Sequence, residues 1–518
     1  MKTILAVNEL TPQKKKGIMF VVFILGLVQN FSSNMFNTTG TAIVAQLSGV
    51  EYYTLQFTIF TLVSGIFIPI QGRRRWLAIG AALFVVGSLT MCAAPTMLVI
   101  LIGRVIVSVA QAIMSGNYLT LIGEISNEKE RPMFMTINGA GIGVAMMLAP
   151  ILAGYFVDKI SWRMVFLFLT VISAIAMILV FAMIPTIKTP AMEQGKKKTP
   201  DWGGGITIAI FGMAFLLAFT WGNSKGWGSP TLIALYVVAV IALIAFISCE
   251  KKGSNPLMPF HLFKYRGFTL GLIAMVAYGP ACYSFSTYTA QIGVGVLGLS
   301  STHTGTFLAV HAIGYLIFNF VWGKLISAKG PRALKPVQLI CLLGLAISMI
   351  ILTFARPGSS AVILYAAEFL GGAFNSALIV GFTQILQKEI PREYIGTGTS
   401  LLQFMMKLGG TLGITIGGMM VSSTWNAGVG SILSGASLSE DVTAALSSSG
   451  TLLNTPGLAA LRESVGAAGE TAFDSTLNSL RMLLNASVSK IFWMAGILLV
   501  VSVILMAFVK SARKDESK

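Results

Sequence analysis

The stretch MVFLFLTVISAIAMILVFAMI, residues Met164–Ile184, contains no charged residue, no glycine and no proline. About twenty residues of α-helix rise by about 30 Å, which is the thickness of the hydrocarbon core of a bilayer. A transmembrane strand would instead need about ten residues that alternate between apolar and polar, and this stretch does not alternate. It is therefore typical of a membrane-spanning helix.

The composition of the whole chain extends this interpretation. Of its 518 residues, 55% are hydrophobic and 11% are charged, whereas soluble domains carry about 25% charged residues. The mean hydropathy is +0.80. These values predict an all-α polytopic membrane protein.

Apolar segments of similar length recur along the chain, and they predict about fourteen transmembrane helices. The expected helices are Gly17–Thr39, Tyr52–Ile70, Trp76–Ala93, Leu98–Ile122, Met133–Val157, Val165–Ile184, Gly203–Trp221, Thr231–Cys249, Phe268–Val294, His303–Trp322, Pro336–Phe354, Ala361–Leu386, Thr397–Ser422 and Ile491–Val509.

The distribution of Lys and Arg predicts how these helices are oriented. Cytoplasmic loops of membrane proteins are enriched in Lys and Arg, and here basic residues gather at both termini and in alternate connections. They include Lys14–Lys16, Arg73–Arg75, Lys196–Lys198, Lys251, Lys252, Lys324, Lys329, Arg332, Lys510, Arg513 and Lys514. We therefore expect a multi-pass protein of a bacterial plasma membrane with both termini in the cytoplasm.

The formal net charge of +17 follows from the same pattern. Because the charge is spread over many short loops and forms no single patch, it does not indicate a nucleic-acid partner. The expected partners are the lipid bilayer and a small-molecule substrate, with protons as a candidate second ligand, and the expected state is a monomer.

The helices divide the chain into five regions. We expect a cytoplasmic tail (1–16), an N-terminal six-helix half (17–186), a linker with two inserted helices (187–265), a C-terminal six-helix half (266–509) and a second tail (510–518). The last half includes a long extracellular loop, 423–490, rich in Ser, Gly and Ala and mildly amphipathic around Thr471–Leu484. A flexible lid and a plain surface loop both fit that composition.

Two basic turns mark an internal repeat. QGRRRWLAIG (Gln71–Gly80) and WGKLISAKGPRALK (Trp322–Lys335) each connect two apolar segments, about 250 residues apart, and two related halves with a binding site between them are a common transporter plan. In this plan the chain resembles the major facilitator superfamily, specifically its fourteen-helix drug/proton antiporter subfamily. Gly323, Leu325 and Gly330 fit the loop signature of that superfamily.

Further stretches carry the resemblance over nearly the full chain. Arg104 in LIGRVIVSVAQAIMSG (Leu101–Gly116) matches the family's helix-4 arginine, and GAGIGVAMMLAPILAG (Gly139–Gly154) is similar to its helix-5 antiporter motif. NPLMPFHLFKYRGF (Asn255–Phe268) also follows the subfamily. The resemblance implies two six-helix halves with two inserted helices, and efflux of amphipathic small organic molecules by alternating access.

The chain departs from this family in helix 1. Proton-driven exporters of the subfamily usually carry an aspartate there, but no acidic residue lies between Glu9 and Glu51. Instead LVQNFSSNMFNTTGTA (Leu27–Ala42) is rich in uncharged polar residues. Asn30 and Asn34, four residues apart, share one face of the helix, where they would line a cavity or donate hydrogen bonds between helices.

Charged groups inside a membrane span are costly, so each is a functional candidate. The candidate substrate-binding residues are Asn30, Asn34, Arg104, Gln111 and Lys407, and the candidate proton-coupling residues are Glu368 and His311. Glu368 is the one carboxylate well inside an expected span. For Arg104, the alternative to anion binding is that it pairs with Glu368 or with helix carbonyls. For Lys407, the alternative is a lysine that is held by polar neighbours and has no role in transport. For His311, it is a neutral histidine that is hydrogen-bonded within the bundle.

Other functional classes find no support in the sequence. It contains no GxxxxGK[ST] loop for ATP, no HExxH and no GxSxG, and three scattered histidines do not make a catalytic metal site. We therefore expect a transporter and no enzyme, without catalytic residues, cofactor or metal. Two functions stay open: multidrug-type efflux, and a carrier for uptake or exchange of organic anions, by uniport or proton symport, because the helix-1 acid is absent.

Overall fold

The computed structural model describes residues 11–47, 73–125, 131–185, 202–252, 258, 260–329, 331–391, 395–436 and 438–509, and nearly all of them are helical. The N-terminal helices are α1 (Pro12–Leu47), α3 (Arg73–Cys92), α4 (Met97–Ile125), α5 (Arg131–Lys159) and α6 (Arg163–Met183), followed by α8 (Trp202–Lys225) and α9 (Pro230–Lys252). The C-terminal elements are η3 (Phe260–Lys264), α10 (Arg266–Gln291), the π-helix η4 (Ile292–Val296), α11 (Ser301–Lys329), η5 (Pro331–Ala333), α12 (Leu334–Leu352), α13 (Val362–Asn375), α14 (Leu378–Gln387), α15 (Ile395–Ser434), α16 (Glu440–Leu446), η7 (Ser449–Leu453) and α17 (Thr455–Phe508).

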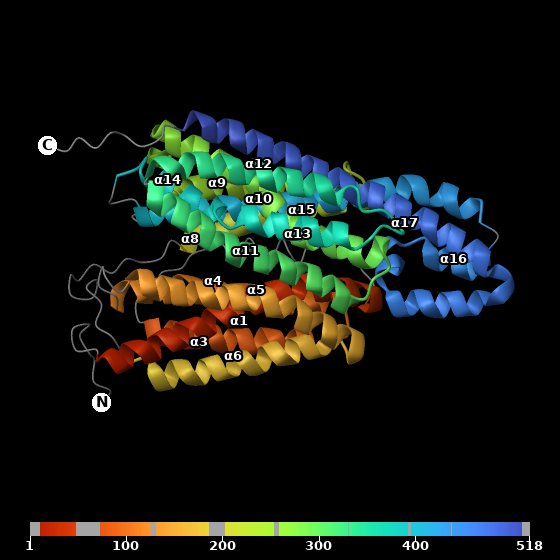
Figure 1. Ribbon diagram of the computed structural model, residues 1–518, viewed down its shortest axis with the longest axis horizontal. Helices are drawn as coiled ribbons and strands as arrows, with labels where there is room; N and C mark the ends of the chain where they lie inside the picture. The colour runs from red at the N-terminus through yellow and green to blue at the C-terminus, as the bar shows by residue number, and fades with distance from the viewer. Residues whose placement is uncertain are drawn as a thin grey trace.

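Two bundles of helices lie side by side (Figure 1). One hydrophobic core is formed almost entirely by helices α1 to α6, and a second by elements from η3 to α17. The pair α8 and α9 pack against each other, and α8 also contacts α15. This is the two-half arrangement with an inserted pair that the sequence predicts.

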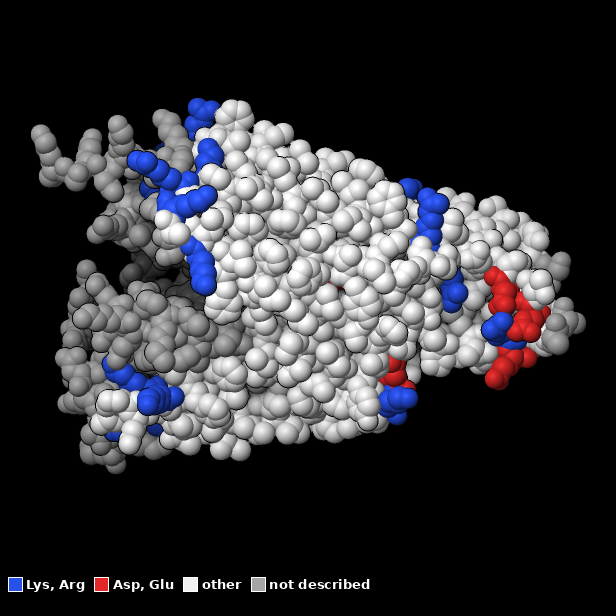
Figure 2. Space-filling model, in the orientation of Figure 1, with Lys and Arg blue, Asp and Glu red and all other residues white. Residues whose placement is uncertain are grey.

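Ten helices within the described residues are long and apolar enough to cross a membrane. Every expected crossing overlaps one or two helices of the structure except Tyr52–Ile70, which lies outside the described residues. The space-filling view shows a broad uncharged band between two charged ends (Figure 2). The fold class predicted from the sequence, an all-α polytopic membrane protein, is confirmed.

We call the end of the molecule where α1 begins and α17 ends the basic end, because Lys14, Arg74 and Lys335 lie there, and the opposite end the distal end (Figure 1). Helix α1 runs from the basic to the distal end, and α6 and α17 run back. The distal end includes the last turn of α5 and the first turn of α11.

One expected helix is interrupted. The segment Ala361–Leu386 forms two helices, α13 and α14, with a break after Asn375. At the break the hydroxyl of Ser376 donates a hydrogen bond to the carbonyl of Ala373. The expected single crossing is therefore built from two shorter helices, a division that hydropathy alone does not reveal.

The expected loop 423–490 is largely helical. The distal parts of α15 and α17, together with α16 and η7, form a helical extension beyond the membrane band, which we call the distal hairpin (Figure 1). Phe473, Leu477, Leu480 and Leu484, spaced to share one face of α17, are all buried. This apolar face gives the hairpin its own core, so it is an ordered structure and no plain loop.

Candidate functional site

The structure brings together the two residues predicted for proton coupling. Nδ1 of His311 on α11 lies 3.0 Å from Oε2 of Glu368 on α13. The Glu368 side chain is 0% exposed and the His311 side chain 13%. Two groups that can each bind a proton therefore share one hydrogen bond inside the C-terminal half.

Glycines allow α11 and α13 to approach closely enough for this contact. A Cβ atom at Gly372 would overlap the carbonyl oxygen of His311, and one at Gly314 would overlap the carbonyl oxygen of Phe369. Small residues at helix contacts are typical of membrane bundles, since they let backbones touch. The short distance between His311 and Glu368 thus depends on glycine residues that lie about one turn from each of them.

Two side chains of α10 lie near the pair. The ring centroid of Phe285 on α10 lies 5.3 Å from that of His311, and Thr289, one turn further along the same helix, is buried. Within the described residues, Oε1 of Glu368 has no hydrogen-bond partner. This oxygen therefore keeps unused hydrogen-bond acceptor capacity inside the C-terminal half.

Helix α10 supplies functional candidates that the sequence reasoning missed. Tyr278, Cys282, Phe285 and Thr289 follow one another at spacings of four, three and four residues, which places them on one face. Tyr278 is buried and donates its hydroxyl hydrogen to Oδ1 of Asn375 on α13. The spacing of these polar and aromatic residues is visible in the sequence and could have predicted that they share a face of the helix.

Lys407 lies on the face of α15 that turns toward the N-terminal half. Lys407, Gly410 and Ile414 share one helical face. Ile414 is buried within the core of the N-terminal half, and the ring of Tyr283, which contacts that same core, packs directly on Gly410. The backbone of Lys407 therefore lies at the junction between the halves, and its side chain is half-buried there.

The polar face of α1 is narrower than the sequence suggested. Asn30 and Asn34 are half-buried, and each donates its amide hydrogen to the carbonyl four residues earlier, at distances of 2.8 and 2.9 Å. Thr38, eight residues after Asn30 and so near the same face, is 3% exposed. Asn30 and Asn34 keep part of their surface exposed and stay the candidates for lining a cavity.

Two further candidates on α4 are buried against α1. Gln111 donates its amide hydrogen to the carbonyl of Gln29 at 3.2 Å. The Arg104 side chain is 1% exposed, and its guanidinium carbon lies 4.3 Å from the centroid of the Phe36 ring. Arg104 thus packs within the N-terminal half, whereas Glu368 pairs with His311, so the alternative of an Arg104–Glu368 pair is not what the structure contains.

The chain is similar to several bacterial transporters. Multidrug resistance protein 3 of Bacillus subtilis is 25% identical over 521 residues, which cover 98% of each protein. Multidrug transporter protein MdtP of the same organism is 26% identical over 437 residues, or 81% of this chain and 77% of that protein. Multidrug resistance protein Stp of Mycobacterium tuberculosis is 24% identical over 376 residues, or 72% and 68%.

Solved structures share the fold. A bacterial homologue of the human lysosomal transporter Spinster superposes with a TM-score of 0.61 at 14% identity and covers 97% of this chain and 100% of its own. A D-xylose–proton symporter gives 0.60 at 14% identity, covering 96% and 98%. The family model described as Major Facilitator Superfamily matches residues 17–413. With its two helical halves and multiple membrane spans, the chain belongs to the major facilitator superfamily of transporters.

Proposed function

We propose that this chain exports amphipathic small organic molecules in exchange for protons, and that His311 and Glu368 bind the coupled proton. The observation that carries the proposal is the buried contact between these two side chains, 3.0 Å apart. The multidrug transporters among its relatives support the direction and the substrate class.

A buried pair of this kind can couple a proton to a conformational change. Binding or losing one proton changes the net charge of the site, and charge inside a membrane protein is costly. The two protonation states therefore favour different surroundings for α11 and α13, and a ligand shifts an equilibrium by its differential affinity for the two conformations. In exchange transport, substrate and proton would occupy the carrier alternately.

The substrate site would lie between the halves. Asn30 and Asn34 of α1 would contribute uncharged hydrogen-bonding groups from one side, and Lys407 and Tyr283 would contribute a cation and an aromatic ring from the other. Uncharged amides and an aromatic ring suit amphipathic molecules of varied shape. The burial of Arg104 and Gln111 favours a role in positioning α1 for this site.

Lys407 favours a second candidate function, which is transport of organic anions by uptake, exchange, uniport or proton symport. No acid is present in the helix-1 segment to attract a cation, and a charge-assisted hydrogen bond to Lys407 would stabilise a bound carboxylate. The two candidates predict opposite preferences for substrate charge.

We further propose that the basic end faces the cytoplasm of a bacterial cell and that the protein acts as a monomer in the plasma membrane. The concentration of Lys and Arg at that end supports this orientation (Figure 2). A cysteine at Ser434 should react with an impermeant maleimide in intact cells, whereas one at Gly72 should react only after permeabilisation. Labelling of Gly72 in intact cells would reverse the assignment.

The function is tested with the purified transporter in lipid vesicles under an imposed pH gradient. Matched cationic and anionic amphiphiles of equal apolar size are offered in turn. Gradient-dependent movement of the cations supports proton-coupled efflux, and movement of the anions alone selects the second candidate. Equal movement with and without the gradient would reject proton coupling.

A further inference from the structure

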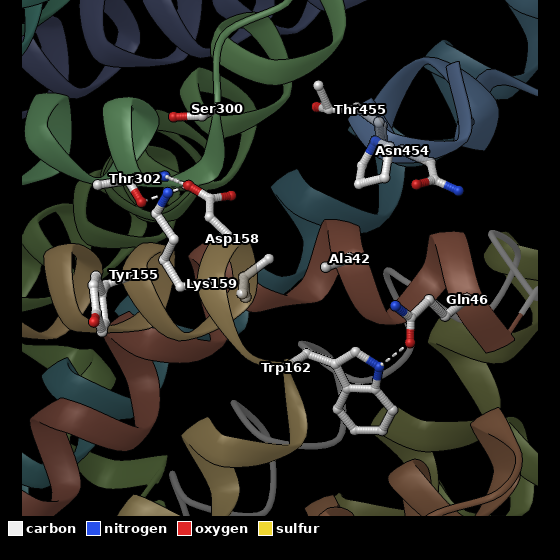
Figure 3. Close-up of a pocket in the computed structure, with 13 residues that line it drawn as sticks. Ala42, Gln46, Tyr155, Asp158, Lys159, Trp162, Ser300, Thr302, Asn454 and Thr455 are labelled. Atoms are coloured by element: carbon white, nitrogen blue, oxygen red, sulfur yellow. Dashed lines mark hydrogen bonds between the residues drawn. The ribbon is translucent and has the colours of Figure 1, made fainter. Parts of the chain in front are cut away.

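A carboxylate of the N-terminal half caps a helix of the C-terminal half at the distal end. Oδ2 of Asp158, in the last turn of α5, accepts hydrogen bonds from the backbone N–H of Thr302 at 2.7 Å and from its hydroxyl at 2.5 Å (Figure 3). Thr302 is in the first turn of α11, where backbone N–H groups lack helical partners. A negative charge is also stabilised there by the helix dipole.

This contact borders a cavity of about 420 Å³ that both halves and the distal hairpin line (Figure 3). Two other polar side chains of the lining are bonded within the protein: Nε1 of Trp162 donates to Oε1 of Gln46 at 2.7 Å, and Oδ1 of Asn454 accepts from the backbone N–H of Gly457. Asp158 itself is exposed. The cavity therefore reaches the Asp158–Thr302 contact from the distal side.

Beyond the contact, α5 and α11 are packed without a gap. A Cβ atom at Gly305 would overlap the carbonyl oxygen of Pro150, and the side chain of Leu316 fills the place of a Cβ at Gly143. Ala309 and Ala312 lie on the face of α11 between these two contacts, and they are 5% and 1% exposed. A path from the distal end to the junction of the halves is closed here.

We propose that Asp158 and Thr302 form a latch that holds the distal side closed and opens once in every transport cycle. Asp158 acts as a positioning residue, because it fixes the start of α11 without contacting substrate. The same helix carries His311 about two and a half turns further on, so closure of the latch also sets the position of one partner of the protonatable pair. The inference requires alternating access, and it is independent of proton coupling.

The first test measures closure directly. Ala309→Cys, in a background with Cys92, Cys249, Cys282 and Cys341 replaced by alanine, reports opening through its reaction with an impermeant maleimide applied to the distal side. Asp158→Ala removes two charge-assisted hydrogen bonds, which should raise the labelling rate at least about tenfold. Thr302→Val should raise it less, because the backbone N–H bond remains, and Thr302→Ser should leave it unchanged.

Lys159→Gln is the matched control, because Lys159 lines the same cavity next to Asp158 and makes neither of the two hydrogen bonds between Asp158 and Thr302. Its labelling rate should equal that of the parent. If Asp158→Ala does not fold, the contrast between Thr302→Val and Thr302→Ser decides. Equal labelling in every variant would overturn the proposal.

The second test asks whether the contact must open during transport. Cysteines at Asp158 and Thr302, joined by a short bis-thiosulfonate cross-linker, should stop substrate exchange, and reduction should restore it. A merely structural contact would stay closed throughout the cycle. Undiminished exchange by the cross-linked protein would therefore overturn the latch, whatever ion drives transport.

Discussion

Arg104 and Glu368 occupy corresponding places in the two halves and differ in what their surroundings allow. Counting the expected segment Tyr52–Ile70 as a second helix, each lies on the fourth helix of its half, about two turns from the start. Arg104 is held against the ring of Phe36, and Glu368 against the imidazole of His311. Arginine keeps its charge at every physiological pH, whereas a carboxyl–imidazole pair can gain or lose a proton. The fourth helix of one half therefore carries a fixed charge, and the fourth helix of the other half carries an exchangeable one.

The basic end shows that the halves nevertheless share a construction. In the N-terminal half, Arg74 at the start of α3 donates to the carbonyl of Phe181 near the end of α6 at 2.6 Å. In the C-terminal half, Lys335 at the start of α12 donates to the carbonyls of Ala507 and Val509 at the end of α17, at 2.7 and 2.8 Å. A cation near a helix C-terminus satisfies free carbonyls and the dipole. The contacts at the basic end are therefore alike in the two halves, whereas the charged residues on the fourth helix of each half differ in chemistry.

The largest effect is expected where the exchangeable pair is forced apart. Gly372→Leu places a side chain where the His311 backbone lies, and overpacking of this kind costs about 3 kcal/mol of stability. We expect little folded protein in the membrane, measured by fluorescence-detected size exclusion. Gly323→Leu on exposed α11 surface, where nothing lies within 4 Å of the added Cβ, should express as the parent does. Equal yields of both variants would contradict the packing argument.

The next effect distinguishes Lys407 from Arg104. Lys407→Gln should raise the half-saturation concentration of an anionic amphiphile at least about tenfold, because it removes a charge-assisted hydrogen bond. Arg104→Lys should leave that concentration nearly unchanged, since Arg104 is 1% exposed and packs against Phe36 of its own half. Concentration dependence of uptake into vesicles measures both. If Lys407→Gln has no effect and lipophilic cations are transported, the anion candidate fails.

A smaller effect isolates the fixed charge itself. Phe36→Leu removes the aromatic face beneath Arg104 and should lower the free energy of unfolding by about 1–2 kcal/mol. The pH dependence of transport should stay that of the parent, because the exchangeable pair lies in the other half. Thermal unfolding in detergent measures the loss of stability, and Phe20→Leu, at a half-exposed position of α1, is the control. A shifted pH profile would break the division between the halves.

The smallest effect concerns the repeated caps. Arg74→Gln and Lys335→Gln should each lower stability by about 0.5 kcal/mol, and by similar amounts if the two contacts are equivalent. Arg75→Gln, at an exposed neighbouring position, should have no effect. Thermal unfolding of all three variants measures these changes in stability. A large difference between Arg74→Gln and Lys335→Gln would show that the two contacts are alike in geometry and differ in energy.

Much of this arrangement could be predicted from the sequence. Long apolar segments predict membrane helices because nothing else satisfies the backbone in lipid. Glu368 and His311 stood out because ionisable residues inside such segments are rare. Their contact could not be predicted, since it depends on how α11 and α13 are rotated and on the glycines that let them meet. For the same reason the sequence left a partner of Arg104 open, and only the structure shows the Phe36 ring.

Two regions were harder to predict for a different reason. The Ser-, Gly- and Ala-rich composition of 423–490 is typical of a loop, and the helices there depend on a single buried face that includes Phe473 and Leu480. The Asp158–Thr302 latch joins residues far apart in the chain through the packing of two halves. Neither composition nor local spacing encodes such a contact, because it exists only once α5 and α11 lie together.

The central claim is that the exchangeable charge of the C-terminal half couples protons to substrate. The direct measurement compares two rates in vesicles that contain Glu368→Gln: substrate accumulation driven by a pH gradient, and exchange of labelled for unlabelled substrate without one. The account predicts that accumulation is lost while exchange persists at nearly the rate of the parent, because exchange needs no net proton movement. Undiminished accumulation in both Glu368→Gln and His311→Gln would contradict it.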